Sequence, residues 1–475
     1  MNQPSQAHPL GTMSRRQMLK LMGTAAGASV LAACVAPAPG GAPASSSGGA
    51  AAPAAAPKKL VVAHRKEYFE EMEKLFVDAV QGWGKENNYE IETNLVASEA
   101  FEDFVAKILA QIQAGDPPSL VYHIRLVQAL YGQDGLDPVT DAAEEAIKLY
   151  GDVPFGHRVV EKIGDDWWGI PYMSSGGGQF ARKDVFAAAG VDIAATTTFD
   201  ERREAALKAS NPEAQVYGWG ITVNKSGDGR GFIEAVIQNW GGHYTDEGLT
   251  QVTFNSPETL AAVEWLAETY LSEKFQPMLP PGVTSWTDSS NNEAYLAGSI
   301  ALTSNAASIY AKAKADKNPV FENTLHLQTA VGPLGQKQQA GGGGYFAIPK
   351  GAPNQDGAKQ LGLHLLKPEI FLPISLISAG LFLPAYANHY TNPEVVKAFE
   401  ADPNLKSMGE ASLGDFPGSS WPALPNAFFD AIQAEAIIED MMAQIITNGA
   451  KPAEAVATAH DRIQKIADEM GALTK

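Results

Sequence analysis

The residue types used by most enzymes are present in this chain, but their spacing matches no catalytic or metal-binding motif. The nine histidines are scattered and form no His-Glu-x-x-His pattern, the spacing that places zinc ligands on one helix face. Neither a Gly-x-Ser-x-Gly nucleophile turn nor a P-loop occurs. Acidic pairs such as Asp165-Asp166 are typical of solvated loops, whereas a glycoside hydrolase needs carboxylates about 5–9.5 Å apart across a cleft. We predict no catalysis, metal or cofactor.

Polar side chains stand instead at the ends of predicted strands. Strand patterns at 58–64, 89–97 and 119–124 alternate with helical patterns at 68–88 and 100–115. This βαβαβ order predicts a parallel sheet, and ligands of such sheets bind beyond the carboxyl ends of the strands. His64, His123 and Arg125 are therefore candidate ligand contacts, although Arg125 also fits a surface ion pair.

Length, charge and the later elements limit the architecture. The chain has 475 residues with 45% hydrophobic content, enough for about three domains or two large lobes. Strands and helices continue to alternate, with helix starts at a Thr198–Glu201 capping box and at Ser256-Pro257. The net charge is −19, and an acidic surface repels the phosphates of nucleic acid and anionic lipid, which argues against both as partners of the folded body. We predict an α/β protein with two lobes.

The N-terminus has the features of an export signal. Arg15, Arg16 and Lys20 precede an apolar stretch that ends at Cys34, the one cysteine of the chain. Thirteen apolar residues reach only ~20 Å, too short for a membrane span. Residues 1–33 resemble a twin-arginine lipoprotein signal whose lipobox makes Cys34 the lipidated residue. An ordinary cleaved signal is the alternative. Residues 34–57 contain Ala, Pro, Gly and Ser almost exclusively, which predicts a disordered tether before the body at 58–475.

Five segments of the body, in order, resemble one protein family. They are AKILAQIQAGDPPSLVYHI (106–124), WWGIPYMSSGGGQFARKDVFAAAGVDI (167–193), VTFNSPETLAAVEWLAETY (252–270), NNEAYLAGSIALTSN (291–305) and the run VGPLG to GGGGYFAIPKGAPNQDGAKQLGLHLLKPE (331–369). Together they resemble the sugar-carrying, maltose-binding-protein-like group of extracellular solute-binding proteins of bacterial ABC transporters. The resemblance implies a type II periplasmic-binding-protein fold, with a ligand cleft between an N-terminal lobe (58–172 and 346–392) and a C-terminal lobe (173–345 and 393–475). Crossings would lie near Pro171–Ser174 and Gly344–Ala347.

The resemblance directs attention to aromatic and amide side chains, because a sugar ring presents an apolar face and a rim of hydroxyl groups. Trp240, Trp286 and Trp421 lie in predicted loops and are candidate platforms for a sugar ring. Ser174 and Ser175 match cleft positions of the family, although a simple turn also explains them. The remaining candidates are hydroxyl partners, with helix capping as the alternative for Asn305: Asn239, Ser304 and Asn305.

Four consecutive glycines, Gly341 to Gly344, raise the question of a phosphate cradle. Such a cradle opens a helix, but here a strand follows and stops at Pro349. Flanking family-like motifs argue against a free linker. We predict that Gly343, Gly344 and Tyr345 form an edge of the cleft, and that a bulky residue at Gly343 impairs binding more than folding.

These observations predict a carbohydrate-binding protein of an ABC importer. It would be monomeric, anchored outside the cytoplasm through Cys34, and would deliver a mono- or oligosaccharide to a membrane permease. Two alternatives stay open: a non-sugar ligand such as a polyol, glycerophosphodiester or peptide, and a secreted carbohydrate-active enzyme.

Overall fold

A computed structural model describes residues 57–96, 101–124, 126–335, 343–414, 418 and 420–474. All described residues belong to one unit, Ala56–Lys475. Cys34 and most of the predicted tether lie outside the described residues, as does Arg125. Among the described residues, every helix is too short or too polar to cross a membrane.

The first sheet is built around the predicted βαβαβ pattern. Strands β1 (Lys58–Arg65), β2 (Tyr89–Val96) and β3 (Leu120–Ile124) pair in parallel, which confirms that prediction. The strand order is β13-β7-β12-β3-β1-β2, where β13 is Leu383–Pro384, β7 is Ile170–Ser174 and β12 is Gly343–Pro349. Strand β12 runs antiparallel to both of its neighbours, and β4 (Leu136–Asp137) extends it.

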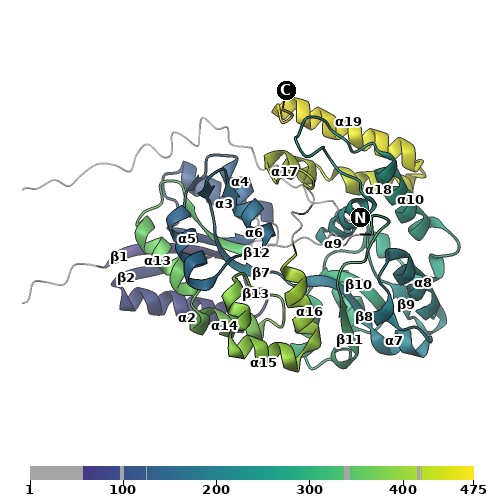
Figure 1. Cartoon of the computed structure of the whole chain (residues 1–475), viewed down its shortest axis with the longest axis horizontal. Coiled ribbons are helices and arrows are strands. Elements are labelled where there is room, and N and C mark those ends of the chain that lie inside the picture. Colours follow the sequence, from purple (N-terminus) through teal and green to yellow (C-terminus); the bar gives the residue numbers. More distant parts are fainter. Residues whose placement is uncertain are drawn as a thin grey trace, which may run out of the picture. The chain divides into compact units, whose positions relative to one another are not determined.

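Alternating side chains of the first sheet bury both of its faces. Leu60, Tyr122 and Phe346 face a core formed with α2 (Glu70–Glu86), α5 (Thr140–Tyr150), α13 (Gln355–Leu365) and α14 (Pro368–Ile377). Val121 and Tyr345 face a smaller core formed with α3 (Phe101–Gln113) and α4 (Leu126–Tyr131). Burial on both faces is typical of a sheet covered by crossover helices. Figure 1 shows α13 and α14 beside this sheet.

A second sheet follows in the chain, with the order β11-β8-β10-β9. Its strands are β8 (Gly177–Arg182), β9 (Tyr217–Trp219), β10 (Ile300–Ala306) and β11 (Thr324–Leu327). The chain leaves the first sheet after Ser174, enters the second at Gly177, and returns at Gly343. A separate two-stranded sheet joins β5 (Lys162–Ile163) to β6 (Asp166–Trp167), next to α6 (Phe155–Glu161).

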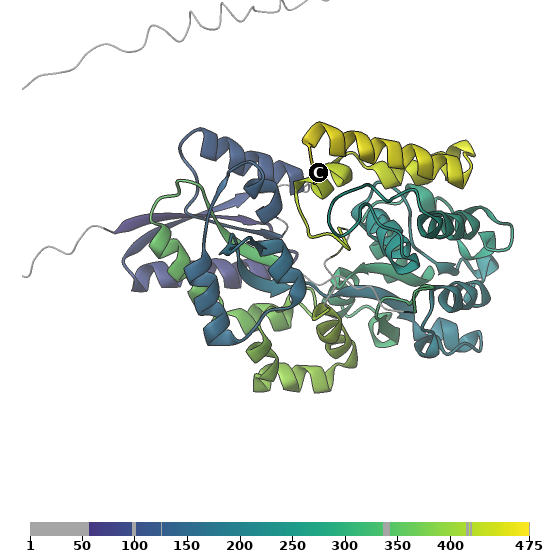
Figure 2. The ribbon, with the colours of Figure 1, turned by 45° about the horizontal axis from the view of Figure 1, so that its top comes forward.

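Helices of the second sheet share a large hydrophobic core. They include α7 (Lys183–Ala188), α8 (Phe199–Ala209), α9 (Gly227–Trp240), α10 (Pro257–Leu271), α17 (Ala427–Ala434), α18 (Ile437–Asn448) and α19 (Pro452–Met470). The predicted capping box at Thr198 and the Ser256 cap are both present. Helices α18 and α19 pack against each other and against α10 (Figure 1 and Figure 2).

Four more α-helices complete the described fold. They are α11 (Ser290–Leu296), α12 (Ser308–Ala315), α15 (Pro393–Ala401) and α16 (Pro403–Ser412). Helix α16 contacts β13 of the first sheet and both β8 and β11 of the second. It therefore bridges the two sheets beside the point where the chain crosses between them.

Gly343 is constrained by the backbone of the neighbouring strand. A Cβ atom there would lie 1.8 Å from the carbonyl oxygen of Met173, because β12 and β7 pair closely at Gly343 and Ser174. This corrects the prediction that a bulky residue at Gly343 affects binding more than folding. The close contact is with the chain itself, so folding should suffer first.

Replacing Gly343 with alanine should therefore lower the free energy of unfolding by about 2–4 kcal/mol, because the two strands must separate to admit a methyl group. Urea unfolding followed by circular dichroism measures the change. Gly82→Ala is the matched control, since nothing lies within 4 Å of its added Cβ in helix α2. Equal stability of the two variants would contradict the prediction.

Candidate functional site

A pocket opens where the N-terminal end of α9 meets the second sheet. It encloses about 610 Å³ of space, including the part open to solvent. Four elements and one loop contribute its lining residues, which are Gly178, Gln179, Phe199, Gly227, Asp228, Gly231, Phe232, Ala235, Ser304, Asn305, Thr329 and Ala330. The predicted residues Ser304 and Asn305 thus lie in this pocket.

Aromatic rings supply the apolar part of the pocket. Phe199 begins α8, Phe232 lies on α9, and their ring centroids are 6.3 Å apart. Gly227 and Gly231 leave the facing surface of α9 free of bulky side chains, and a Cβ at Gly231 would meet no atom within 4 Å. The result is a smooth apolar surface with open space above α9.

Paired strands supply one polar wall. Gln179 on β8 and Ser304 on β10 are direct partners in the register, so their side chains lie on the same face. Gln179 Nε2 donates a hydrogen bond of 3.3 Å to Ser304 Oγ. Beneath them, Arg202 Nη1 donates to Gln179 Oε1 at 2.6 Å.

Asp228 supplies the one ionisable side chain among the lining residues that the structure describes. Its Oδ2 accepts a hydrogen bond of 2.8 Å from Asn291 Nδ2, and its backbone N–H donates to Asp288 Oδ1 at 2.9 Å. Burial raises the pKa of Asp228 to about 7, and the nearby Asp288 charge acts in the same direction against the hydrogen bond from Asn291. The carboxyl group thus titrates near neutral pH.

Asn305 contributes a second amide to the pocket. Its Nδ2 donates to Asn292 Oδ1, and its Oδ1 accepts a hydrogen bond of 3.1 Å from Ser308 Oγ. The N-cap of α12 is Ala307, so Asn305 does not have the alternative capping role. These bonds hold the amide plane in one orientation at the pocket wall.

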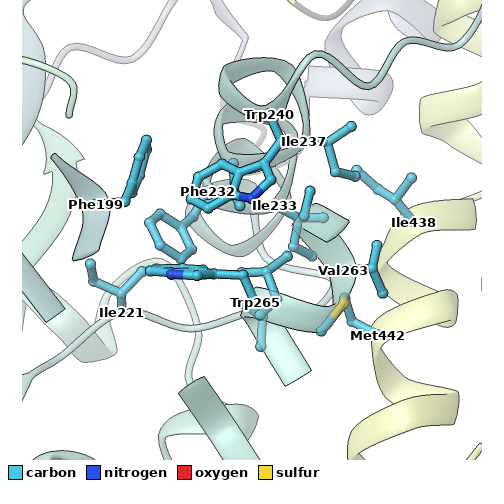
Figure 3. Close-up of a cluster of buried hydrophobic side chains, with 14 of the residues drawn as sticks. Phe199, Ile221, Phe232, Ile233, Ile237, Trp240, Val263, Trp265, Ile438 and Met442 are labelled. Carbon is cyan, nitrogen blue, oxygen red and sulfur yellow. The ribbon is translucent and has the colours of Figure 1, made fainter. Parts of the chain in front are cut away.

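Asn239 and Trp240 lie elsewhere, which corrects their predicted place in a cleft. Helix α9 continues to Trp240 and ends at Gly241, so no loop exposes the ring. The Trp240 ring lies 5.4 Å from Phe199 and 5.2 Å from Trp265 between centroids, inside the core that Figure 3 shows. Asn239 is fully buried and donates to the carbonyl of Ala235.

Trp286 and Trp421 are partly buried, and neither lines the pocket. Trp286 packs against both large hydrophobic cores, and its carbonyl accepts a hydrogen bond of 2.7 Å from Asn224 Nδ2. Trp421 follows Gly418, whose carbonyl accepts the Trp421 backbone N–H at 3.1 Å. A ligand role for these two rings stays a prediction.

The candidates in the first sheet come together around β12. Register places Tyr345 opposite His123, and Gly343 opposite Ser174, while Gly344 is buried between the neighbouring strands β3 and β7. The side chains of Tyr345 and His123 already contact other residues of the fold. Tyr345 Oη accepts from the backbone of Val127 at 2.7 Å, and the His123 ring lies 4.5 Å from Phe104.

His64, Ser174 and Ser175 differ in their exposure to solvent. His64 is 1% exposed, its Nδ1 lies 2.9 Å from the carbonyl of Arg65, and burial lowers its pKa. Ser175 is exposed in the crossing, whereas Ser174 is fully buried. His157 lies between Ser174 Oγ (3.1 Å from Nε2) and Glu161 Oε1 (2.7 Å from Nδ1). This array has hydrolase-like residue types, but all three side chains are buried away from any pocket described.

Sequence reasoning did not identify Gln179, Asp228 or the two phenylalanines of the pocket. One local signal was available for Asp228, because the segment Ser226-Gly-Asp-Gly-Arg-Gly combines a helix cap with glycines that leave space. Gln179 has no comparable signal. Among the described residues, no group of three or more His, Cys, Asp or Glu side chains is placed to hold a metal ion.

Comparisons with known proteins agree on one family and one fold. The model of the family described as "Bacterial extracellular solute-binding protein" matches residues 78–407. No curated protein sequence matches the chain.

Three similar solved structures carry different ligands. Maltose-bound MalE3 of T. maritima has a TM-score of 0.71 and 17% identity, with 86% of this chain and 99% of that chain covered. An ABC transporter solute-binding protein of Thermotoga lettingae bound with α-D-tagatose has a TM-score of 0.69 and 17% identity, with 86% of this chain and 99% of that chain covered. An ABC transporter solute-binding protein of Agrobacterium radiobacter in complex with ribitol has a TM-score of 0.67 and 17% identity, with 86% of this chain and 98% of that chain covered. This likeness confirms the predicted type II periplasmic-binding-protein fold.

Proposed function

The chain belongs to the family of bacterial extracellular solute-binding proteins, and we propose that it captures a carbohydrate outside the cytoplasm and delivers it to an ABC permease. The observation that carries this proposal is the composition of the pocket. An apolar surface of Phe199 and Phe232 lies beside the amides of Gln179 and Asn305, the hydroxyl of Ser304 and the carboxyl of Asp228. A sugar has the matching combination of an apolar C–H face and many hydroxyl groups.

The charge of the pocket favours a neutral, hydroxyl-rich ligand. Asp228 would repel the phosphate of a glycerophosphodiester, and no cationic side chain lines the described part of the pocket to offset it. A carboxylate accepts hydrogen bonds from two hydroxyl groups, as neighbouring positions on a sugar or polyol provide. A sugar or its reduced polyol therefore fits better than an anionic ligand.

We further propose that the protein works as a membrane-tethered monomer without catalysis. Support for the tether comes from the N-terminal pattern, in which a stretch that resembles a twin-arginine signal, then Cys34 and about two dozen small residues precede the folded body. The predicted lobes, 58–172 with 346–392 and 173–345 with 393–475, would then close on the ligand by a hinge motion.

A thermal-shift panel tests the carbohydrate proposal. Maltose, D-tagatose and ribitol are compared with glycerophosphocholine and a dipeptide, each at several concentrations. A ligand at 100 times its Kd stabilises the folded state by about 2.7 kcal/mol, so at least one sugar or polyol should raise the Tm by several degrees.

The control is Gly231→Trp, because Gly231 lines the pocket, a Cβ there would meet no atom within 4 Å, and the indole should fill the pocket. It should fold normally and show no shift with the same ligand. Stabilisation by none of the three hydroxyl-rich compounds would contradict the proposal, and so would an equal shift in the blocked variant.

A further inference from the structure

Arg202 is a buried cation directly behind the pocket. It lies on α8 with 4% of its surface exposed, and it forms no ion pair with a carboxylate among the described residues. Its Nη1 atom donates to two neutral acceptors, Gln179 Oε1 at 2.6 Å and the carbonyl of Gln328 at 2.8 Å. The Nε atom has no hydrogen-bond partner. Burying a cation in this way is costly, which calls for a reason beyond packing.

The bond from Arg202 fixes the orientation of the Gln179 amide. An arginine side chain carries only donors, so the oxygen of the amide must face it. The amide nitrogen then faces Ser304, in agreement with the bond of 3.3 Å from Gln179 Nε2 to Ser304 Oγ. The reversed amide would bring two donors together at 2.6 Å, which the charge of Arg202 makes strongly unfavourable.

The fixed amide in turn fixes the direction of the next hydrogen bond. Ser304 Oγ already accepts from Gln179, and its own hydrogen has no acceptor among the described residues. Because Ser304 lines the pocket, that hydrogen is free to point at a ligand oxygen. Asp228, on α9, lines the same pocket and offers acceptor oxygens when it is ionised. The wall that contains Ser304 therefore offers a hydrogen-bond donor to the ligand, and Asp228 offers acceptor oxygens to it.

We propose that Arg202 is a positioning residue that sets the direction of the chain Arg202 to Gln179 to Ser304 to ligand. Specificity follows from this direction. The ligand must present an acceptor oxygen to Ser304 and a hydroxyl hydrogen to Asp228, which vicinal hydroxyl groups on a sugar or polyol do. The inference rests on the proposed carbohydrate function, because it concerns the same pocket.

A double-mutant cycle on the full-length chain tests whether Arg202 acts through Gln179. Isothermal titration calorimetry is performed with whichever of maltose, D-tagatose or ribitol binds the wild type most tightly. Arg202→Met should weaken binding about 10-fold, the loss of one oriented hydrogen bond, and Arg202→Lys should recover most of it. In a Gln179→Leu background, Arg202→Met should have less than about a 2-fold effect. An equal effect in both backgrounds would overturn the proposal.

Gln179→Glu is a second variant that keeps the shape of the side chain. Its carboxylate would pair with Arg202 and preserve the fold, but it would accept the Ser304 hydrogen and remove the donor from the pocket. Binding should fall about 10-fold while the Tm stays equal or rises. Retained affinity in this variant would overturn the proposed direction.

A ligand-free measurement separates this inference from the proposed function. In the chain labelled with ¹⁵N-glutamine, the Gln179 side-chain amide signals are identified by their loss in Gln179→Leu. They should shift in Arg202→Met and remain near their wild-type positions in Arg202→Lys. Unchanged signals in Arg202→Met would sink the positioning role, whatever the ligand. A wild type that binds none of the three compounds counts against the carbohydrate function alone.

Discussion

Replacing Asp228 with alanine is expected to weaken carbohydrate binding by about 100-fold while leaving the protein folded. Hydrogen bonds to a charged group contribute about 1.5–3 kcal/mol, and the variant also removes the bond of 2.8 Å that Asn291 Nδ2 donates to Asp228 Oδ2. Because Asp228 is the one ionisable side chain among the described lining residues, no neighbour in the pocket replaces it. Calorimetric titration with the sugar that binds the wild type measures the loss. Asp461→Ala, an exposed position on α19, is the control.

The pKa of the Asp228 carboxyl group predicts how carbohydrate binding depends on pH. Its pKa is about 7 because burial disfavours the ionised form, and only the ionised form accepts hydrogen bonds with both oxygens. Affinity should be high at pH 8 and fall as the pH drops through 7, by up to about tenfold per pH unit. Asp228→Asn should bind weakly and almost independently of pH. A wild-type affinity that is constant between pH 5.5 and 8, or higher at pH 5.5, would contradict this assignment.

Replacing Glu67 with glutamine is expected to change the pH dependence of stability. Glu67 follows β1 and is 6% exposed, and its Oε2 lies 3.9 Å from Arg65 Nε, beyond hydrogen-bonding distance. Burial raises the pKa of Glu67 to about 7, against an ordinary value of 4.5, more strongly than the Arg65 charge lowers it. The folded state therefore binds a proton that the unfolded state releases between these two values.

The sign of the effect follows from proton linkage. Stability from this group is fully present below pH 4.5 and is lost as the pH rises through 7, for a total of about 3 kcal/mol. Glu67→Gln removes that titration, so the variant should match the wild type at pH 4.5 and exceed its unfolding free energy at pH 8. Urea unfolding at both pH values measures the difference, with the exposed Glu70→Gln as control. A difference that is the same at both pH values would refute the assignment.

Local patterns in the sequence correctly predicted several elements because their causes are local. The β-branched strand at 58–64 and the amphipathic helix after it form the expected parallel unit, and the Thr198 and Ser256 caps start their helices. Ser304 and Asn305 reach the pocket because they lie at the less buried, carboxyl end of β10, where an open sheet presents polar side chains to a ligand. A polar residue near the end of a predicted strand is therefore a useful candidate for a pocket, even when its hydrogen-bond partners are not predicted.

Trp240 shows where the same reasoning fails. The glycines that follow it were interpreted as a loop, but Gly241 ends a helix with φ at 93° and leaves Trp240 in the last helical turn. The direction of its ring is set by Phe199 and Trp265, which come from helices 41 and 25 residues away in the chain (240 − 199 and 265 − 240). No local pattern around Trp240 contains those neighbours.

By itself, the sequence determined the alternation of strands and helices and the family, and it predicts a signal at the N-terminus, because each depends on the order of nearby residues. The tertiary structure alone decided which polar groups share a pocket. Gln179 and Ser304 are 125 residues apart, and Asp228 and Asn291 are 63 residues apart. Their hydrogen bonds form only after strands and helices have packed, so their directions are a property of the assembled fold.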